Sequence, residues 1–492
     1  MPSPPTETPR REMESLDPAD WEEIRRLAHR MIDDGIDHLR DVRSRPVWQD
    51  MPPAVREAFR SGLPQEPQPL AQVYDEVAAS VMPYPMGNIH PRFWAWYMGC
   101  SNITGALADF LAAVQGSNLG GGNHAATLLD NQVVDWLKTM MGFPAEASGS
   151  LVSGGSMANL IGLVVARNVM AGATGVDVRE EGMAAARPLC FYGSDQLHGC
   201  HRKTMETLGL GNNALRRIGT DQRLRIDCDA LRARIATDRA DGRHPACIIA
   251  SAGTVNTGAI DDLPGLAAIA RDEGLWLHVD GCIGALLAIA PDNAWRVAGL
   301  ELADSIALDP HKLLHAPFEA GCVLVRDAAA HRKSFAVDSE YLQSTRRGLP
   351  SGDWLYELGL QTSRGFRALK IWMALKEHGV DKFGRLIDQT IALAGELARR
   401  VAAEETLELV VEPQLNIVCF RYRRPGLDAD RLKAVNVEIM LRLQEQGTAA
   451  VSDTTVHGTH CLRAAIANYR TRPEDLALLV SETTRIGRTL AS

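Results

Sequence analysis

The chain has 492 residues, of which 46% are hydrophobic and 23% are charged, and its formal net charge is −9. This length is more than one compact core usually needs, so we expect several domains, and the negative charge excludes nucleic acid and anionic membrane surfaces as first candidates for a partner. The longest apolar runs, residues 161–166 and 283–290, are much shorter than the about 20 residues that cross a bilayer, so we expect no membrane span.

The N-terminal sequence and the cysteines indicate the cellular compartment of the protein. Residues 1–15 are rich in proline and charge and lack the apolar core of a signal peptide, so we expect a loose arm and no secretion. The nine cysteines are scattered, without a CxxC pair or a spacing typical of disulfides. This pattern suits a reducing compartment, and we therefore predict a cytoplasmic protein.

The first hundred residues show helical patterns and one aromatic cluster. A helical pattern covers residues 21–40, and the cluster contains Phe93, Trp94, Trp96 and Tyr97. Aromatic residues at this density usually line a core or a pocket. We take residues 1–100 as an N-terminal helical segment that precedes the main domain.

Between about residues 130 and 330, short apolar strands alternate with helical stretches, which is typical of an α/β fold. The expected strands are 189–192, 247–251, 275–279, 305–308 and 322–325. They are apolar throughout, as in a largely parallel sheet with helices on both faces. We predict an α/β domain over residues 101–378 and a smaller α+β domain over residues 379–492. Ligands of such sheets bind at the carboxyl ends of the strands.

A glycine-rich turn precedes one of the expected helices. Ser153, Gly154, Gly155 and Ser156 lead into apolar positions that recur with helical spacing at 157, 160, 161, 164 and 165. A helix N-terminus of this kind presents unpaired N–H groups and suits a phosphate group. Taken alone, an ordinary glycine and serine loop explains the turn at least as well. The motif is neither GxGxxG nor a Walker A sequence.

Two expected strands end in residues that suit catalysis. Asp280 ends a buried-looking strand, and a buried carboxylate needs a partner such as a protonated ring nitrogen. Lys312 follows the strand 305–308, and a lysine partly removed from water has a lowered pKa and becomes nucleophilic, as Schiff-base chemistry requires. For each residue alone, a structural role or, for Asp280, a metal-binding role is the simpler explanation.

Together, these three elements predict a cofactor. A phosphate-binding helix end, a carboxylate for a pyridinium nitrogen and a lysine for a Schiff base are the anchors that pyridoxal phosphate needs. Asp280 and Lys312 are 32 residues apart, enough for one crossover helix and one return strand, which places both side chains at the same edge of the sheet.

At these motifs the sequence resembles the group II pyridoxal-phosphate decarboxylases, which include aromatic-L-amino-acid, histidine and glutamate decarboxylases. The resemblance covers residues 85–380 well and the C-terminal part more weakly, through residues 462–468. It implies a fold type I architecture, like that of aspartate aminotransferase, with pyridoxal phosphate as the cofactor and no metal. It also implies a homodimer with active sites at the interface, in which residues 1–100 pack on the partner.

The resemblance implies a role for each motif residue. Gly155 and Ser156 match the phosphate-binding turn, His198 the histidine that stacks on the cofactor ring, Thr254 the threonine beside the ring, Asp280 the partner of the pyridine nitrogen, His311 a phosphate contact and Lys312 the Schiff-base lysine. Tyr341 matches a loop tyrosine that resembles a proton donor to the substrate carbon. The polar stretch around Gly348 and Pro350 suits a flexible lid, although a plain surface loop has the same composition.

These matches imply decarboxylation of an L-amino acid to the amine and carbon dioxide. We expect Trp96 and Tyr97 to contact the substrate, and an aromatic substrate is favoured because stacking contributes about 0.5–1.5 kcal/mol per pair. The family often has a bulky aromatic residue where this chain has Leu313, and the segment from Trp96 departs from that of the aromatic decarboxylases. An acidic substrate such as glutamate or aspartate, bound through Arg92, is the alternative.

Three other functions are compatible with the same fold. An aldehyde synthase would couple decarboxylation to oxidative deamination, but its loop tyrosine is typically phenylalanine, so Tyr341 argues against it. An aminotransferase would pass the amino group to a keto acid. A non-catalytic scaffold is the third, and the presence of Lys312, Asp280, His198 and Tyr341 together argues against it.

Overall fold

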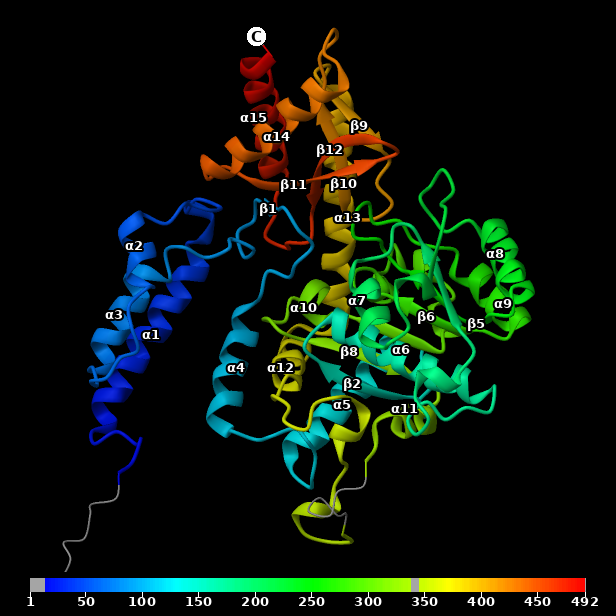
Figure 1. Cartoon of the computed structure of the whole chain (residues 1–492). Coiled ribbons are helices and arrows are strands. Elements are labelled where there is room, and N and C mark those ends of the chain that lie inside the picture. Colours follow the sequence, from blue (N-terminus) through cyan, green and yellow to red (C-terminus); the bar gives the residue numbers. More distant parts are fainter. Residues whose placement is uncertain (1–13, 338–344, 492) are drawn as a thin grey trace, which may run out of the picture. The chain divides into compact units, whose positions relative to one another are not determined.

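The computed structural model describes residues 14–337 and 345–491 (Figure 1). The described chain separates into two compact units. One unit contains the described residues up to Ser44 together with Pro52–Pro83, and the other contains Arg45–Met51 together with the chain from Tyr84 onward. The domain boundaries expected near residues 100 and 378 stay predictions.

The first unit is helical. It contains α1 (Trp21–Arg40), α2 (Pro53–Ala58) and α3 (Leu70–Ser80), and α1 confirms the helical pattern expected over residues 21–40. The Asp20 side chain caps α1 by accepting hydrogen bonds from the first free backbone N–H groups. Arg30 of α1 forms a 2.7 Å ion pair with Asp75 of α3. The Tyr74 hydroxyl donates a 2.7 Å hydrogen bond to Asp34, so polar contacts join the two helices.

The second unit contains a seven-stranded sheet with the order β2-β8-β7-β6-β5-β3-β4. Its strands are β2 (Ser148–Val152), β3 (Leu189–Ser194), β4 (Leu215–Ile218), β5 (His244–Ser251), β6 (Trp276–Asp280), β7 (Ser305–Leu308) and β8 (Gly321–Val325). All neighbours are parallel except β8, which runs antiparallel to β2 and β7. The five strands expected from sequence are therefore present, and the predicted largely parallel α/β sheet is confirmed.

Helices cover both faces of this sheet. The helices of this part are α4 (Ile103–Gln115), α5 (Ala125–Met140), α6 (Gly155–Gly172), α7 (Cys200–Thr207), α8 (Cys228–Ala240), α9 (Leu263–Glu273), α10 (Pro310–Leu313), α11 (Ala328–Phe335) and α12 (Ala368–His378). In β5, Ile248 and Ala250 join one hydrophobic core, while Cys247 and Ile249 join the core on the opposite face. This alternation explains why the central strands are apolar at every position.

The connection from β6 to β7 differs from the expectation. The predicted crossover helix is wrong, because the chain forms three short 3₁₀ turns, Ala285–Ile289, Ala294–Val297 and Leu300–Leu302. Pro291 lacks a backbone N–H and Gly299 has a φ of 92°, so a continuous α-helix is unfavourable here. Asp280, which ends β6, and Lys312, which follows β7, nevertheless lie at the same edge of the sheet, as expected, because β6 and β7 are parallel neighbours.

A smaller five-stranded sheet has the order β1-β11-β12-β10-β9. Its elements are β1 (Phe93–Trp94), α13 (Val380–Ala403), β9 (Leu407–Val411), β10 (Ile417–Tyr422), α14 (Ala429–Glu445), β11 (Ala450–Val456), β12 (Thr459–Ala465) and α15 (Pro473–Ala491). Strand β1 pairs in parallel with β11, so the aromatic segment reaches this sheet and Trp94 is fully buried in its core. Helix α13 packs on β9, on β10 and on the first 3₁₀ turn after β6, and thereby links the two sheets (Figure 1).

None of the helices in residues 14–337 and 345–491 is long and apolar enough to cross a membrane.

Candidate active site

A cavity of about 460 Å³ opens at the carboxyl end of β6. It is lined by all of the predicted site residues that the structure describes, namely Trp96, Tyr97, Gly155, Ser156, His198, Thr254, Asp280, His311 and Lys312. Tyr341 lies outside the described residues. The fold thus gathers side chains that span more than two hundred positions of sequence at one sheet edge, as expected for an open α/β sheet.

The glycine-rich turn forms the N-terminus of α6. Gly154 has a φ of 145°, a backbone conformation that residues with a side chain rarely adopt. A Cβ atom on Gly155 would lie 2.3 Å from the Cys282 sulfur and 2.8 Å from Asp309 Oδ2, so only glycine fits there. No side chain caps the helix, and its first backbone N–H groups therefore remain available to an anion.

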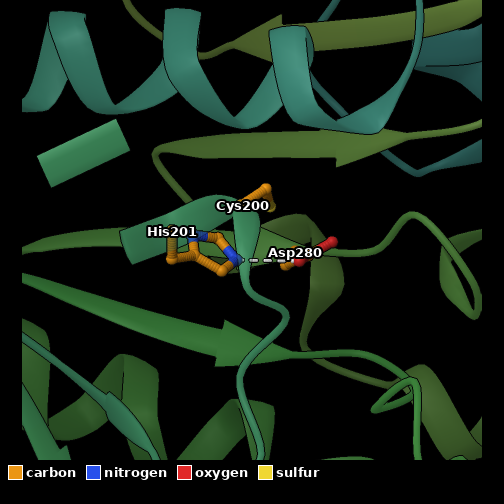
Figure 2. A group of neighbouring side chains, drawn as sticks. All are labelled: Cys200, His201 and Asp280. Carbon is orange, nitrogen blue, oxygen red and sulfur yellow. Dashed lines mark hydrogen bonds and ion pairs between the residues drawn. The ribbon is translucent and has the colours of Figure 1, made fainter. Parts of the chain in front are cut away.

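Asp280 ends β6 and is hydrogen bonded to a buried histidine. Its Oδ2 accepts a 2.8 Å hydrogen bond from Nε2 of the fully buried His201, which lies on α7 (Figure 2). Burial alone would raise the pKa of Asp280, but the hydrogen bond and charge of His201, a hydrogen bond from the Cys282 side chain and the charge of Lys312 outweigh it, so the pKa lies well below its usual range. Asp280 is therefore ionised.

Lys312 lies on the one-turn helix α10 and is paired with Asp309. Its Nζ is 2.9 Å from Asp309 Oδ2. Burial lowers the pKa of Lys312, but the charge of Asp309, with smaller effects of Cys282 and Asp280, outweighs burial and raises the pKa above its usual range. The lowered pKa expected from sequence is wrong for the cofactor-free chain, because a carboxylate three residues earlier holds the ammonium group.

The other predicted cofactor contacts surround this pair. His198 precedes α7, and its Nδ1 accepts a 3.2 Å hydrogen bond from the Cys200 N–H. Thr254 is buried, and its Oγ1 accepts a 3.1 Å hydrogen bond from the Ala259 N–H. His311 is buried beside Phe318, with 4.6 Å between the ring centroids. Backbone contacts thus hold His198 and Thr254 in place at the cavity wall.

The predicted substrate contacts differ in exposure. Tyr97 is buried, and its hydroxyl donates a 2.9 Å hydrogen bond to Asn416 Oδ1. Trp96 is 55% exposed, although it lines the cavity. Phe318 also lines the cavity and is 51% exposed. The cavity therefore has an aromatic wall that is open to solvent in the single chain.

Two polar residues of the site were missed at the level of sequence. Asp309 follows the strand 305–308, and its position three residues before Lys312 on a one-turn helix brings the two charges together. No periodicity distinguishes His201 in the sequence, and only its spacing of three residues from His198 offers a signal. Sequence spacing brings Asp309 to Lys312, whereas His201 acquires its role from a contact between α7 and β6.

Cys200, His201 and Asp280 also form a buried group whose ligand atoms lie within 4.8 Å of one another (Figure 2). Such a group is a candidate metal site by composition. Burial, however, raises the pKa of the Cys200 thiol to about 12, so the sulfur is protonated at neutral pH and is a poor ligand. His201 and Asp280 are already joined by a hydrogen bond. A metal therefore does not explain this group.

The residues of the cavity fit pyridoxal phosphate. The glycine turn leaves space and unpaired N–H groups for a phosphate, Asp280 offers an ionised carboxylate, and Lys312 offers an amine. The buried Oδ1 of Asp309 has no hydrogen-bond partner among the described residues, which indicates that a polar group from outside the chain completes this wall.

Comparisons with known proteins agree with this assignment. The model of the family described as pyridoxal-dependent decarboxylase conserved domain matches residues 52–423. The chain is 34% identical over 464 residues to an aromatic-L-amino-acid decarboxylase of Bacillus atrophaeus, which covers 92% of this chain and 93% of that protein.

Two solved plant structures are also similar. A tryptophan decarboxylase of Catharanthus roseus in complex with L-tryptophan has a TM-score of 0.86 and 26% identity, over 96% of this chain and 100% of that one. A TDC of Oryza sativa with PLP and tryptamine has a TM-score of 0.90 and 25% identity, over 97% of this chain and 100% of that one.

Proposed function

The chain belongs to the pyridoxal-dependent decarboxylase family, and on this premise we propose that it removes the α-carboxylate of an aromatic L-amino acid and releases carbon dioxide and the amine. The observation that carries the proposal is the convergence of Lys312, Asp280 and the uncapped N-terminus of α6 on one cavity with an aromatic wall. Relatives named for aromatic substrates support the choice of substrate class.

We assign each cofactor contact to a residue of the cavity. The N-terminus of α6 at Gly155 and Ser156, with His311, binds the phosphate, and Lys312 binds the cofactor covalently. Asp280 holds a proton on the pyridine nitrogen, while His198 and Thr254 fix the position of the ring. Once bound, pyridoxal phosphate supplies an electron sink for the electron pair that carbon dioxide leaves behind.

The cavity wall favours an aromatic substrate over an acidic one. Trp96, Tyr97 and Phe318 offer aromatic surface. Among the described residues that line the cavity there is no arginine to pair with a second carboxylate, and Arg92, the candidate from sequence, does not line it. An acidic side chain would therefore be buried without a guanidinium partner at this wall, which is costly.

We also propose a homodimer, as the family resemblance implies. Helix α4 exposes apolar residues along one face with helical spacing, namely Ile103, Leu107, Phe110, Leu111 and Val114, each 39–71% exposed. A continuous apolar face of this kind typically marks a protein interface. A partner on this face is consistent with the exposed Trp96 and Phe318 of the cavity. The nine free cysteines support a cytoplasmic location.

The proton that replaces carbon dioxide needs a donor, and we assign this role to Tyr341. A general acid contributes about 10²- to 10⁴-fold to the rate. Tyr341→Phe is therefore expected to reduce amine formation by at least about a hundredfold, with aldehyde, ammonia and hydrogen peroxide measured in the same assay. Unchanged amine formation would move the role to another residue.

The test of the proposed function is a screen for carbon dioxide release. Holoenzyme is incubated with each of the common amino acids, and the products are identified by mass. We expect L-tryptophan, L-tyrosine or L-phenylalanine to be converted to the amine faster than L-glutamate or L-aspartate. Preference for an acidic substrate would overturn the aromatic assignment, amino transfer to an added keto acid would indicate an aminotransferase, and no turnover of any amino acid would overturn the enzymatic function.

A further inference from the structure

A buried histidine on α7, His201, supports the carboxylate of Asp280. The imidazole is fully buried, and its Nε2 lies 2.8 Å from Asp280 Oδ2 (Figure 2). The other oxygen, Oδ1, accepts a 3.3 Å hydrogen bond from the Cys282 backbone N–H. Of the described residues, Asp280 lines the cavity and His201 does not. His201 can therefore act on a bound cofactor only through Asp280.

The hydrogen bond to Asp280 defines which ring nitrogen of His201 carries a proton. An ionised carboxylate only accepts hydrogen bonds, so Nε2 of His201 carries the proton. Nδ1 is buried and has no hydrogen-bond partner among the described residues. The ring therefore presents an N–H donor to Asp280.

A second buried histidine lies beside His201 and is hydrogen bonded to groups other than Asp280. His278 lies two residues before Asp280 on β6, and its ring centroid is 6.5 Å from that of His201. Ser305 Oγ accepts a hydrogen bond from Trp276 Nε1 and lies 2.8 Å from His278 Nδ1, while His278 Nε2 lies 2.7 Å from Asn159 Oδ1. Burial lowers the pKa of His278 to about 3, so it stays neutral.

The donor also influences where a shared proton resides. An N–H that donates to a carboxylate stabilises the carboxylate relative to the carboxylic acid. When Asp280 faces a pyridine nitrogen, a proton between them can lie on the nitrogen or on the carboxyl group. The hydrogen bond from His201 favours the arrangement with the proton on the nitrogen, where it makes the ring an electron sink.

We propose that His201 is a positioning residue for the cofactor, which orients Asp280 and keeps the shared proton on the pyridine nitrogen. This inference rests on the proposed function, because it requires pyridoxal phosphate beside Asp280. His201 is not one of the residues that carry the family resemblance in the sequence. Its role follows from the contact between α7 and β6.

The test uses holoenzyme loaded with pyridoxal phosphate labelled with ¹⁵N in the ring, whose chemical shift reports whether the nitrogen is protonated. His201→Leu removes the donor, and His201→Gln places an amide N–H near the position of Nε2. We expect the Leu variant to shift the ¹⁵N signal toward the unprotonated ring and to lose about ten- to a hundredfold in kcat. We expect the Gln variant to restore most of both.

A matched control and a second pair of variants keep the test decisive. His331 is also fully buried and hydrogen bonded, but it is not a cavity residue, so His331→Leu should leave the ¹⁵N shift unchanged. If His201→Leu does not fold, His201→Asn, whose amide is one methylene shorter, replaces it and should lose the signal that His201→Gln keeps. Equal ¹⁵N shifts in wild type and in all His201 variants would overturn the inference. A wild type that binds no cofactor would instead overturn the proposed function.

Discussion

The glycine at the start of α6 offers the sharpest steric prediction. In Gly155→Ala, the new Cβ would lie 2.3 Å from the Cys282 sulfur, where ordinary contact requires about 3.5 Å or more, so atoms must move by about 1.2 Å. Gly155 has ordinary helical backbone, and the strain therefore arises from space alone. Overpacking of this size costs about 1–3 kcal/mol.

The strain should appear in cofactor binding. Cys282 and Asp309, the two groups that the methyl group displaces, both line the cavity, so their displacement changes the shape of the proposed cofactor site. We expect the Kd for pyridoxal phosphate, measured by titration of cofactor absorbance, to rise about five- to 150-fold. Adding Cys282→Ala should recover part of the loss.

Gly172 at the far end of the same helix provides the matched control. A Cβ there meets nothing within 4 Å, so Gly172→Ala should bind the cofactor as the wild type does. If Gly155→Ala bound pyridoxal phosphate as tightly as the wild type and Gly172→Ala, steric strain at Gly155 would not affect the cofactor site.

Three further predictions concern charge, pH and assembly. Asp309→Asn removes the charge that raises the pKa of Lys312, so an amine-selective reagent should label Lys312 of the cofactor-free protein at lower pH than in the wild type; an unchanged labelling profile would contradict the pairing. Burial lowers the pKa of His331 to about 4, whereas a histidine of the unfolded chain has a pKa of about 6.5, so the folded protein loses stability as the pH falls from about 6.5 to about 4. In His331→Gln, the urea concentration at the unfolding midpoint should change less with pH over this range. An unchanged dependence on pH would contradict this role of His331. Phe110→Glu on the exposed face of α4 should yield a monomer in sedimentation, whereas Leu302→Glu, also exposed, should not, and a dimer in both would place the interface elsewhere.

Much of the fold could be predicted because it depends on local pattern. The apolar runs of β5 to β8 and the polar residues that follow them are visible in the sequence. Because β6 and β7 are parallel neighbours, Asp280 and Lys312, which follow their apolar runs, lie at the same edge of the sheet. The glycine turn before α6 was predictable for the same reason, since helix periodicity begins directly after it.

Contacts between distant segments could not be predicted in this way. The pairing of β1 with β11 joins residues more than three hundred positions apart, and no local pattern encodes it. The role of His201 likewise depends on a contact between α7 and β6. Asp309 is close to Lys312 in sequence, but the raised pKa of Lys312 depends on the approach of the two side chains to 2.9 Å, which spacing alone does not give. Sequence patterns indicate which residues carry chemistry, whereas packing decides their charge states.

The most direct test of the account is to identify the residue that binds the cofactor. Holoenzyme is reduced with borohydride, digested and analysed by tandem mass spectrometry, with Lys312→Ala treated in parallel. We expect the wild type to carry the reduced cofactor on Lys312 and the variant to carry none. A cofactor fixed to another lysine, or a label that persists in Lys312→Ala, would contradict the central assignment.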